Sequence, residues 1–190
     1  MKKLYIISLA LVLSTVMLIT AVIPTMAAKP IDTKQPVAWI DIADNNSRAF
    51  SDSGINKSMF TLSVKLLVDN SIVGTYKLHD FTTGTKAWDV IDPYTGSGET
   101  FWWANFWYDE ETGARMADVA FWAYWDNYPE WPASPLRIVV ADYGEPGQQD
   151  WYRWWNWNPA ANDWSPLFEG KAITITSGNA QIHWNVPDGN

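Results

Sequence analysis

The sequence predicts an all-β protein, an antiparallel sandwich or barrel of about ten short strands that follows an N-terminal signal peptide. The clearest observation is strict alternation, in which Phe60, Leu62, Val64 and Leu66 are separated by polar side chains. Turn residues also recur at hairpin spacing, as at Asn70. No amphipathic helical period is evident after the leader, so strands and turns account for the chain.

The first 28 residues have the three parts of a secretory signal peptide. Lys2 and Lys3 precede an apolar run over 4–23, and the small residue Ala27 suits a peptidase. Retention of this run as a membrane anchor is the alternative, because its length approaches that of a membrane span. We expect residues 1–28 to be removed, leaving 29–190 as a single all-β domain without a membrane span, either secreted or held at the cell surface.

Composition excludes several classes of protein. Of 13 basic residues, two lie in the leader, so 11 remain against 21 acidic residues and the mature charge is near −10. Such a surface repels nucleic acid. The chain has no cysteine, which excludes disulfides and thiolate metal sites. We therefore expect packing alone to stabilise the domain.

Alternation and turn signals place the strands in order along the chain. For 118–125 a helix competes with a strand because alanines are frequent, but aromatic density favours the strand. Polar residues predict loops over 43–56 and 158–166, and prolines predict an extended connection before residue 136. The expected strands are 36–42, 60–66, 72–81, 86–91, 101–108, 116–125, 136–142, 151–157, 173–176 and 180–184.

The hairpin over 136–157 indicates which aromatic side chains face water. Gly144, Pro146 and Gly147 reverse the chain between its two strands. Arg153 is rarely buried unpaired, so its face of the second strand is expected outside, and Tyr152 falls on the opposite face. By the same reasoning Asp118 marks the outer face of its strand, which leaves Val119, Phe121 and Trp125 inside.

Indole rings that share an exposed sheet face could stack on sugar rings along a polysaccharide. Two alternatives remain open: the rings fill a core or a protein–protein interface, or they line a barrel that holds a small ligand. The candidate ligand-binding residues are Trp103, Trp107, Trp122, Tyr124, Trp151, Trp155 and Trp157.

Three segments resemble the uncharacterised secreted β modules known as post-COAP domains. They are the loop Asp142-Tyr143-Gly144-Glu145-Pro146-Gly147-Gln148-Gln149-Asp150, the segment 170–183 and the hairpin 69–85 with its His79-Asp80-Phe81-Thr82-Thr83-Gly84. The chain differs from the family in its aromatic segments 101–125 and 151–157. The resemblance implies a secreted β fold and brings no known activity.

Metal and catalytic chemistry have weaker support. Asp142, Glu145 and Asp150 are calcium candidates, but their spacing matches no standard loop, and bonds from the two aspartates to turn amides explain them as well. No pair of acids stands out for glycoside hydrolysis, and two histidines are too few for a zinc site. We therefore expect no enzyme activity, no metal and no cofactor.

Together these observations predict a secreted, non-catalytic, tryptophan-rich module that binds a polysaccharide or another cell-envelope component. The alternative is a structural cell-surface or extracellular protein whose aromatic face is a protein–protein interface, with a homo-oligomer as one form.

Overall fold

The computed structural model describes residues 32–47, 58–81, 84–127, 133–144, 149–167 and 170–184. The expected signal peptide over 1–28 lies outside these residues. The described part contains no α-helix, and none of its elements is a helix able to cross a membrane. Its strands are β1 (Pro36–Ser47), β2 (Ser58–Leu67), β3 (Ile72–Asp80), β4 (Lys86–Asp89), β5 (Phe101–Asp109), β6 (Ala114–Trp125), β7 (Ser134–Asp142), β8 (Trp151–Asn158), β9 (Asp163–Pro166), β10 (Ile173–Thr174) and β11 (Gly178–Trp184).

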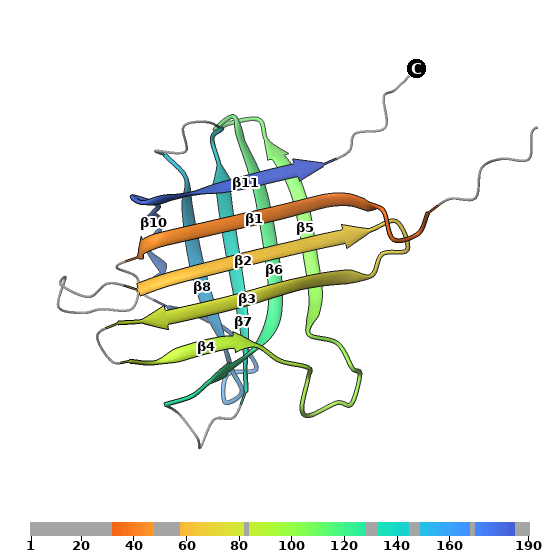
Figure 1. The fold of residues 1–190 in the computed structure, drawn as a ribbon, viewed down its shortest axis with the longest axis vertical. Coiled ribbons are helices and arrows are strands. Elements are labelled where there is room, and N and C mark those ends of the chain that lie inside the picture. The colour runs from red at the N-terminus through yellow and green to blue at the C-terminus, as the bar shows by residue number, and fades with distance from the viewer. Residues whose placement is uncertain are drawn as a thin grey trace, which may run out of the picture. The chain divides into compact units, whose positions relative to one another are not determined.

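The strands form one antiparallel sheet that folds over itself into two layers. Its order is β10-β8-β7-β6-β4-β3-β2-β1-β11, with β5 paired to β6 and β9 paired to β8. In Figure 1, β1–β4 and β11 lie in front of β5–β8, and the strands of the two layers cross steeply. Strand β4 joins the layers because it pairs with both β3 and β6. The sheet does not close, since no ladder joins β11 to β10 among these strands.

Aromatic side chains from both layers fill the core. Phe60 of β2 contacts Tyr152 and Trp154 of β8, with ring centroids 4.8 and 5.5 Å apart. Tyr76 of β3 packs on Phe121 of β6 at 4.8 Å. All five rings are buried. Edge-to-face pairs such as the two that Phe60 forms stabilise a core by about 1 kcal/mol each beyond the apolar area that they bury.

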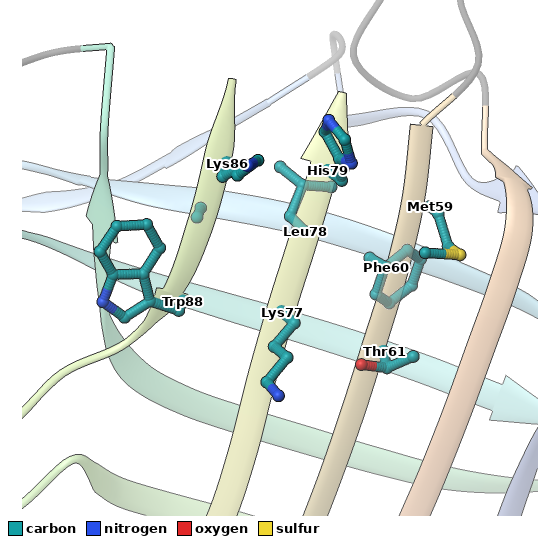
Figure 2. A pocket seen from close by; sticks show the side chains of 9 residues that line it. Met59, Phe60, Thr61, Lys77, Leu78, His79, Lys86 and Trp88 are labelled. Carbon is teal, nitrogen blue, oxygen red and sulfur yellow. The ribbon is translucent and has the colours of Figure 1, made fainter. Parts of the chain in front are cut away.

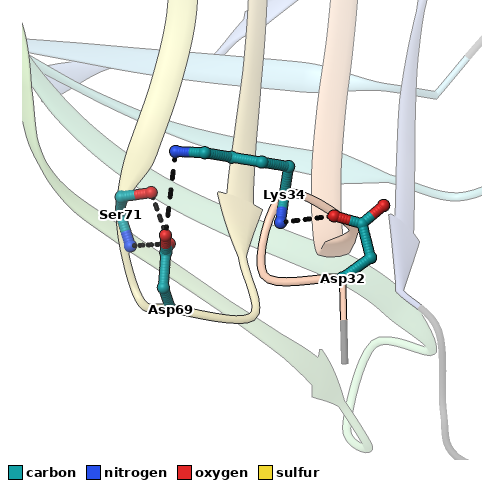
Figure 3. A network of polar contacts seen from close by, with 4 residues as sticks. All are labelled: Asp32, Lys34, Asp69 and Ser71. Atoms are coloured by element: carbon teal, nitrogen blue, oxygen red, sulfur yellow. Dashed lines mark hydrogen bonds and ion pairs between the residues drawn. The ribbon is translucent and has the colours of Figure 1, made fainter. Parts of the chain in front are cut away.

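The turn between β2 and β3 shows how local polar groups define the hairpin (Figure 3). Asp69 Oδ1 accepts hydrogen bonds from the amide and the hydroxyl of Ser71, at 3.0 and 2.5 Å. Asn70 adopts a left-handed φ of 63°, which asparagine tolerates well. The Ser71 hydroxyl and amide lower the pKa of Asp69, and Lys34 lies 3.9 Å from its Oδ2. The predicted reversal at 69–70 is confirmed.

The predicted all-β antiparallel fold is confirmed, including a strand over 118–125, but the loops predicted over 43–56 and 158–166 were wrong in part. Residues 43–47 continue β1, because they pair with β2 and with β11 despite their polar character. Residues 163–166 form β9, which returns along β8 after a turn in which Asn158 Oδ1 accepts the amides of Ala160 and Ala161. The predicted loop over 48–56 lies outside the described residues.

Candidate functional site

A β-bulge in β5 places two adjacent tryptophans on the outer side of the rear layer. Phe101 pairs with Phe121, and the next registered pair is Trp103 with Ala120, so Trp102 is the extra residue. Strict alternation would put Phe101 and Trp103 on one face. Because the bulge shifts the register, Phe101 is buried while Trp103 is 50% exposed.

These tryptophans border a groove on the outer side of β5, β6, β7 and β9. Ala120 forms its floor, since its small side chain lies between larger neighbours on the paired strands. The groove has a volume of about 260 Å³. We call it the tryptophan groove, and its lining residues are Trp102, Trp103, Asp118, Ala120, Arg137 and Trp164.

A bidentate ion pair supplies the polar groups of the tryptophan groove. Arg137 Nε and Nη2 donate to Asp118 Oδ1 and Oδ2 at 2.8 and 2.7 Å. The Asp118 side chain is nearly buried, whereas that of Arg137 is about one-third exposed. The hydrogen bonds to Asp118 raise the pKa of Arg137, so the guanidinium stays charged. The pair is neutral overall and leaves further guanidinium N–H groups available to a ligand.

None of the seven predicted ligand-binding residues is buried. Trp103 and Trp107 are exposed, at 50% and 37%, and they make no ring or cation contact with other described residues. The remaining five, Trp122, Tyr124, Trp151, Trp155 and Trp157, are half-buried. Of the seven, only Trp103 lines the tryptophan groove.

Neighbouring side chains cover part of each half-buried ring. Arg137 lies over Trp155 with its guanidinium 5.5 Å from the ring centroid, and Arg153 lies over Trp151 at 4.9 Å. Such cation–π contacts occupy an indole face that a sugar would otherwise use. The other contacts are Trp122 with Tyr94 and Trp102, Tyr124 with Trp88, and Trp157 with Trp164, at 4.9–5.5 Å.

Two of the three calcium candidates hold the β7–β8 turn against β11. The carboxylate of Asp142 and that of Asp150 each accept two backbone amides, which is the role that the sequence offered as the alternative to calcium binding. The third candidate, Glu145, lies outside the described residues. In the part of the chain that is described, no three His, Asp or Glu residues cluster as metal ligands. The four bonds run from Gly144 N and Ile182 N to Asp142, at 2.7 and 2.8 Å, and from Tyr143 N and Ala180 N to Asp150, at 3.0 and 3.1 Å.

Sequence reasoning missed most of the groove. Trp164 fell in an expected loop, and Trp102 required knowledge of the bulge. Asp118 indicated the outer face of its strand, but its contact with Arg137 depends on the β6–β7 register, which pairs Ala120 with Arg137. The outward position of Asp118 was the one local signal for this ion pair.

Comparisons with family models, curated proteins and solved structures find no match to this chain. The resemblance to the post-COAP domains stays a prediction from the sequence.

Proposed function

We propose that the protein is a secreted, non-catalytic module that holds a polysaccharide or cell-envelope glycan in the tryptophan groove. The observation that carries the proposal is the combination of indole walls with a fixed Asp118–Arg137 pair on one exposed sheet face. Indole faces stack on the apolar faces of sugar rings, and the pair offers charged hydrogen-bonding groups to sugar hydroxyls.

The groove's chemistry supports binding. Asp118 contributes the single carboxylate among its lining residues, and both oxygens of that carboxylate already accept from Arg137. A glycosidase needs two carboxyl groups on either side of the scissile bond. Recognition by stacking and hydrogen bonding needs only the groups that are present.

The test measures binding to insoluble polysaccharides and to affinity gels that contain soluble glycans. Trp103→Ala and Trp164→Ala remove opposite parts of the groove, and each is expected to lower affinity about tenfold. Trp107→Ala is the matched control, because Trp107 is also exposed on β5 but lies outside the groove. Equal loss in all three variants, or binding unaffected by Trp103→Ala, contradicts the proposal.

A second candidate function, self-association, has its own structural support. Strand β5 pairs with β6 on one side and with no other strand of the described part, and it carries the exposed Trp103 and Trp107. An aromatic edge strand is a template for pairing with another chain. Light scattering decides the question: a dimer that becomes monomeric in Trp107→Lys supports an interface, whereas a wild-type monomer excludes it.

A further inference from the structure

A second pocket lies on the outer side of the front layer and shares no residue with the tryptophan groove. It has a volume of about 520 Å³ and lies over β2, β3 and β4. Strand pairing places Lys77 opposite Trp88 and His79 opposite Lys86. Directly opposed residues have Cβ atoms about 5 Å apart, so these four side chains form one block on one face. Figure 2 shows this block, with Met59 and Thr61 beside it on β2.

The block concentrates positive charge in an acidic chain. The net charge is −8, yet neither Lys77 nor Lys86 forms an ion pair with another described residue. The acid next to Lys86 is Asp126, whose carboxylate accepts the Lys86 backbone amide at 2.7 Å. Two ammonium groups on neighbouring strands, neither in an ion pair with a described residue, attract an anion to this face of the sheet.

The same pocket also has an aromatic wall. Trp88 is 39% exposed and packs on Tyr124 of β6, with ring centroids 4.9 Å apart. In Figure 2 the Lys86 side chain points from β4 toward β3, whereas the Trp88 indole lies on the other side of β4. An indole and two ammonium groups on one face of paired strands fit a ligand that has both a ring with an apolar face and an anionic substituent.

We propose that this pocket binds a carboxylated sugar, a uronic acid residue of an acidic glycan. Trp88 stacks on the pyranose ring, while Lys77 and Lys86 pair with its carboxylate. The site is independent of the tryptophan groove, whose charges cancel, and it therefore extends the protein's ligands to anionic glycans.

Calorimetric titration with oligogalacturonate tests the proposal, with the neutral galacto-oligosaccharide of equal length as the control ligand. The expected result is binding of the acidic oligomer alone, weakened by salt because exposed charges are screened. The double variant Lys77→Gln/Lys86→Gln is expected to lose at least about tenfold in affinity, and Trp88→Ala a similar amount. Lys65→Gln is the matched control, since Lys65 is exposed on β2 outside the pocket.

Three results overturn the proposal. The first is a double variant that is folded by circular dichroism and binds oligogalacturonate as tightly as the wild type does. The second is a neutral oligomer that binds as tightly as the acidic one. The third is inorganic phosphate that binds as tightly as the uronate, with both affinities unchanged in Trp88→Ala. Retained binding in Lys77→Arg/Lys86→Arg supports it, because that variant keeps both charges. Failure of this site leaves the proposed function testable, since variants of the tryptophan groove retain every residue of this pocket.

Discussion

Gly178 is a position where the fold accepts no side chain. Its φ is +149°, and a Cβ atom there would lie 1.8 Å from the carbonyl oxygen of Ala43 on β1. Gly178→Ala must therefore separate β11 from β1, and we expect a loss of more than about 2 kcal/mol in the free energy of unfolding. Urea titration measures the loss. Gly96→Ala is the control, because its φ is also positive, at +69°, but nothing lies within 4 Å. Equal losses in the two variants would show that conformation, not the clash, sets the cost.

Tyr76 buries a hydroxyl that has no hydrogen-bond partner among the described residues. Leaving a polar group unsatisfied in a core is unfavourable, so Tyr76→Phe is expected to leave the free energy of unfolding unchanged or to raise it by about 1 kcal/mol. Tyr152→Phe is the matched control, because the Tyr152 hydroxyl donates to Asp44 Oδ2 at 3.1 Å and its removal is expected to cost about 1 kcal/mol. A comparable loss in Tyr76→Phe would reveal a partner for its hydroxyl.

Alkaline titration gives this comparison a second readout. Burial raises the pKa of Tyr76 above its ordinary value of 10.0. A raised folded-state pKa contributes stability that is present below about pH 10 and is lost as the pH rises above it. The wild type is therefore expected to lose more stability than Tyr76→Phe above pH 10.

At the scale of the element, carboxylates instead of a neighbouring strand accept the backbone amides on the edge of β11 that faces away from β1. Asp142 and Asp150 accept the amides of Ile182 and Ala180, and Arg115 donates to the Ile182 carbonyl at 3.1 Å. Asp142→Ala leaves the buried amide of Ile182 unpaired and is expected to cost about 2 kcal/mol, with faster hydrogen exchange in β11. The matched control is Asp163→Ala, at an exposed position whose carboxylate accepts the adjacent amide of Trp164 and no other group of the described residues. A melting temperature that calcium raises in the wild type but not in Asp142→Ala would instead assign the carboxylates to a metal.

The loop before β5 depends on the ionised form of Asp92. Burial alone would raise the pKa of Asp92, but hydrogen bonds to its carboxylate hold this pKa below its usual value. The donors are the hydroxyl and amide of Thr95, the amide of Tyr94 and the hydroxyl of Ser97. Because the folded pKa is depressed, the contribution to stability is present above the ordinary value of 3.8 and is lost as the pH falls through the folded value.

Asp92→Asn tests this assignment. The variant is expected to be less stable than wild type at neutral pH and to lose less stability between about pH 5 and pH 2. Melting temperatures across that range provide the measurement. Parallel pH profiles for the two proteins would show that Asp92 contributes nothing through its charge.

Strand alternation predicts which residues face inward wherever pairing is regular. In β8 it correctly placed Tyr152 and Trp154 inside and the odd-numbered tryptophans outside, since both inward rings are buried. It failed at the bulge, where Phe101 and Trp103 share a parity but lie on opposite faces. A bulge arises from pairing with β6 and leaves no local sign in the sequence.

At the scale of the whole molecule, the layer arrangement depends on contacts that no local pattern encodes. Strand β11 pairs with β1, which lies at the other end of the described chain. Strand β4 pairs with β6, although β5 lies between them in the sequence. Alternation predicts that each strand has an apolar face but not which faces meet. The tryptophan groove was unpredictable for the same reason, because Asp118 and Trp164 come together only through the order β6-β7-β8-β9.

This connectivity predicts cooperative unfolding. Both layers belong to one hydrogen-bonded sheet, and one cluster of buried residues draws side chains from β1, β2, β3, β6, β7, β8 and β11. Neither layer can keep its apolar face buried once the other opens, so the core is expected to unfold in a single step. Urea curves from far-ultraviolet circular dichroism and from tryptophan fluorescence should coincide, the latter reporting in part on the buried Trp154. If fluorescence changed at lower urea than circular dichroism, the layers would unfold separately. In that case β4 would join two independent units, and the tryptophan groove would depend on the rear layer alone.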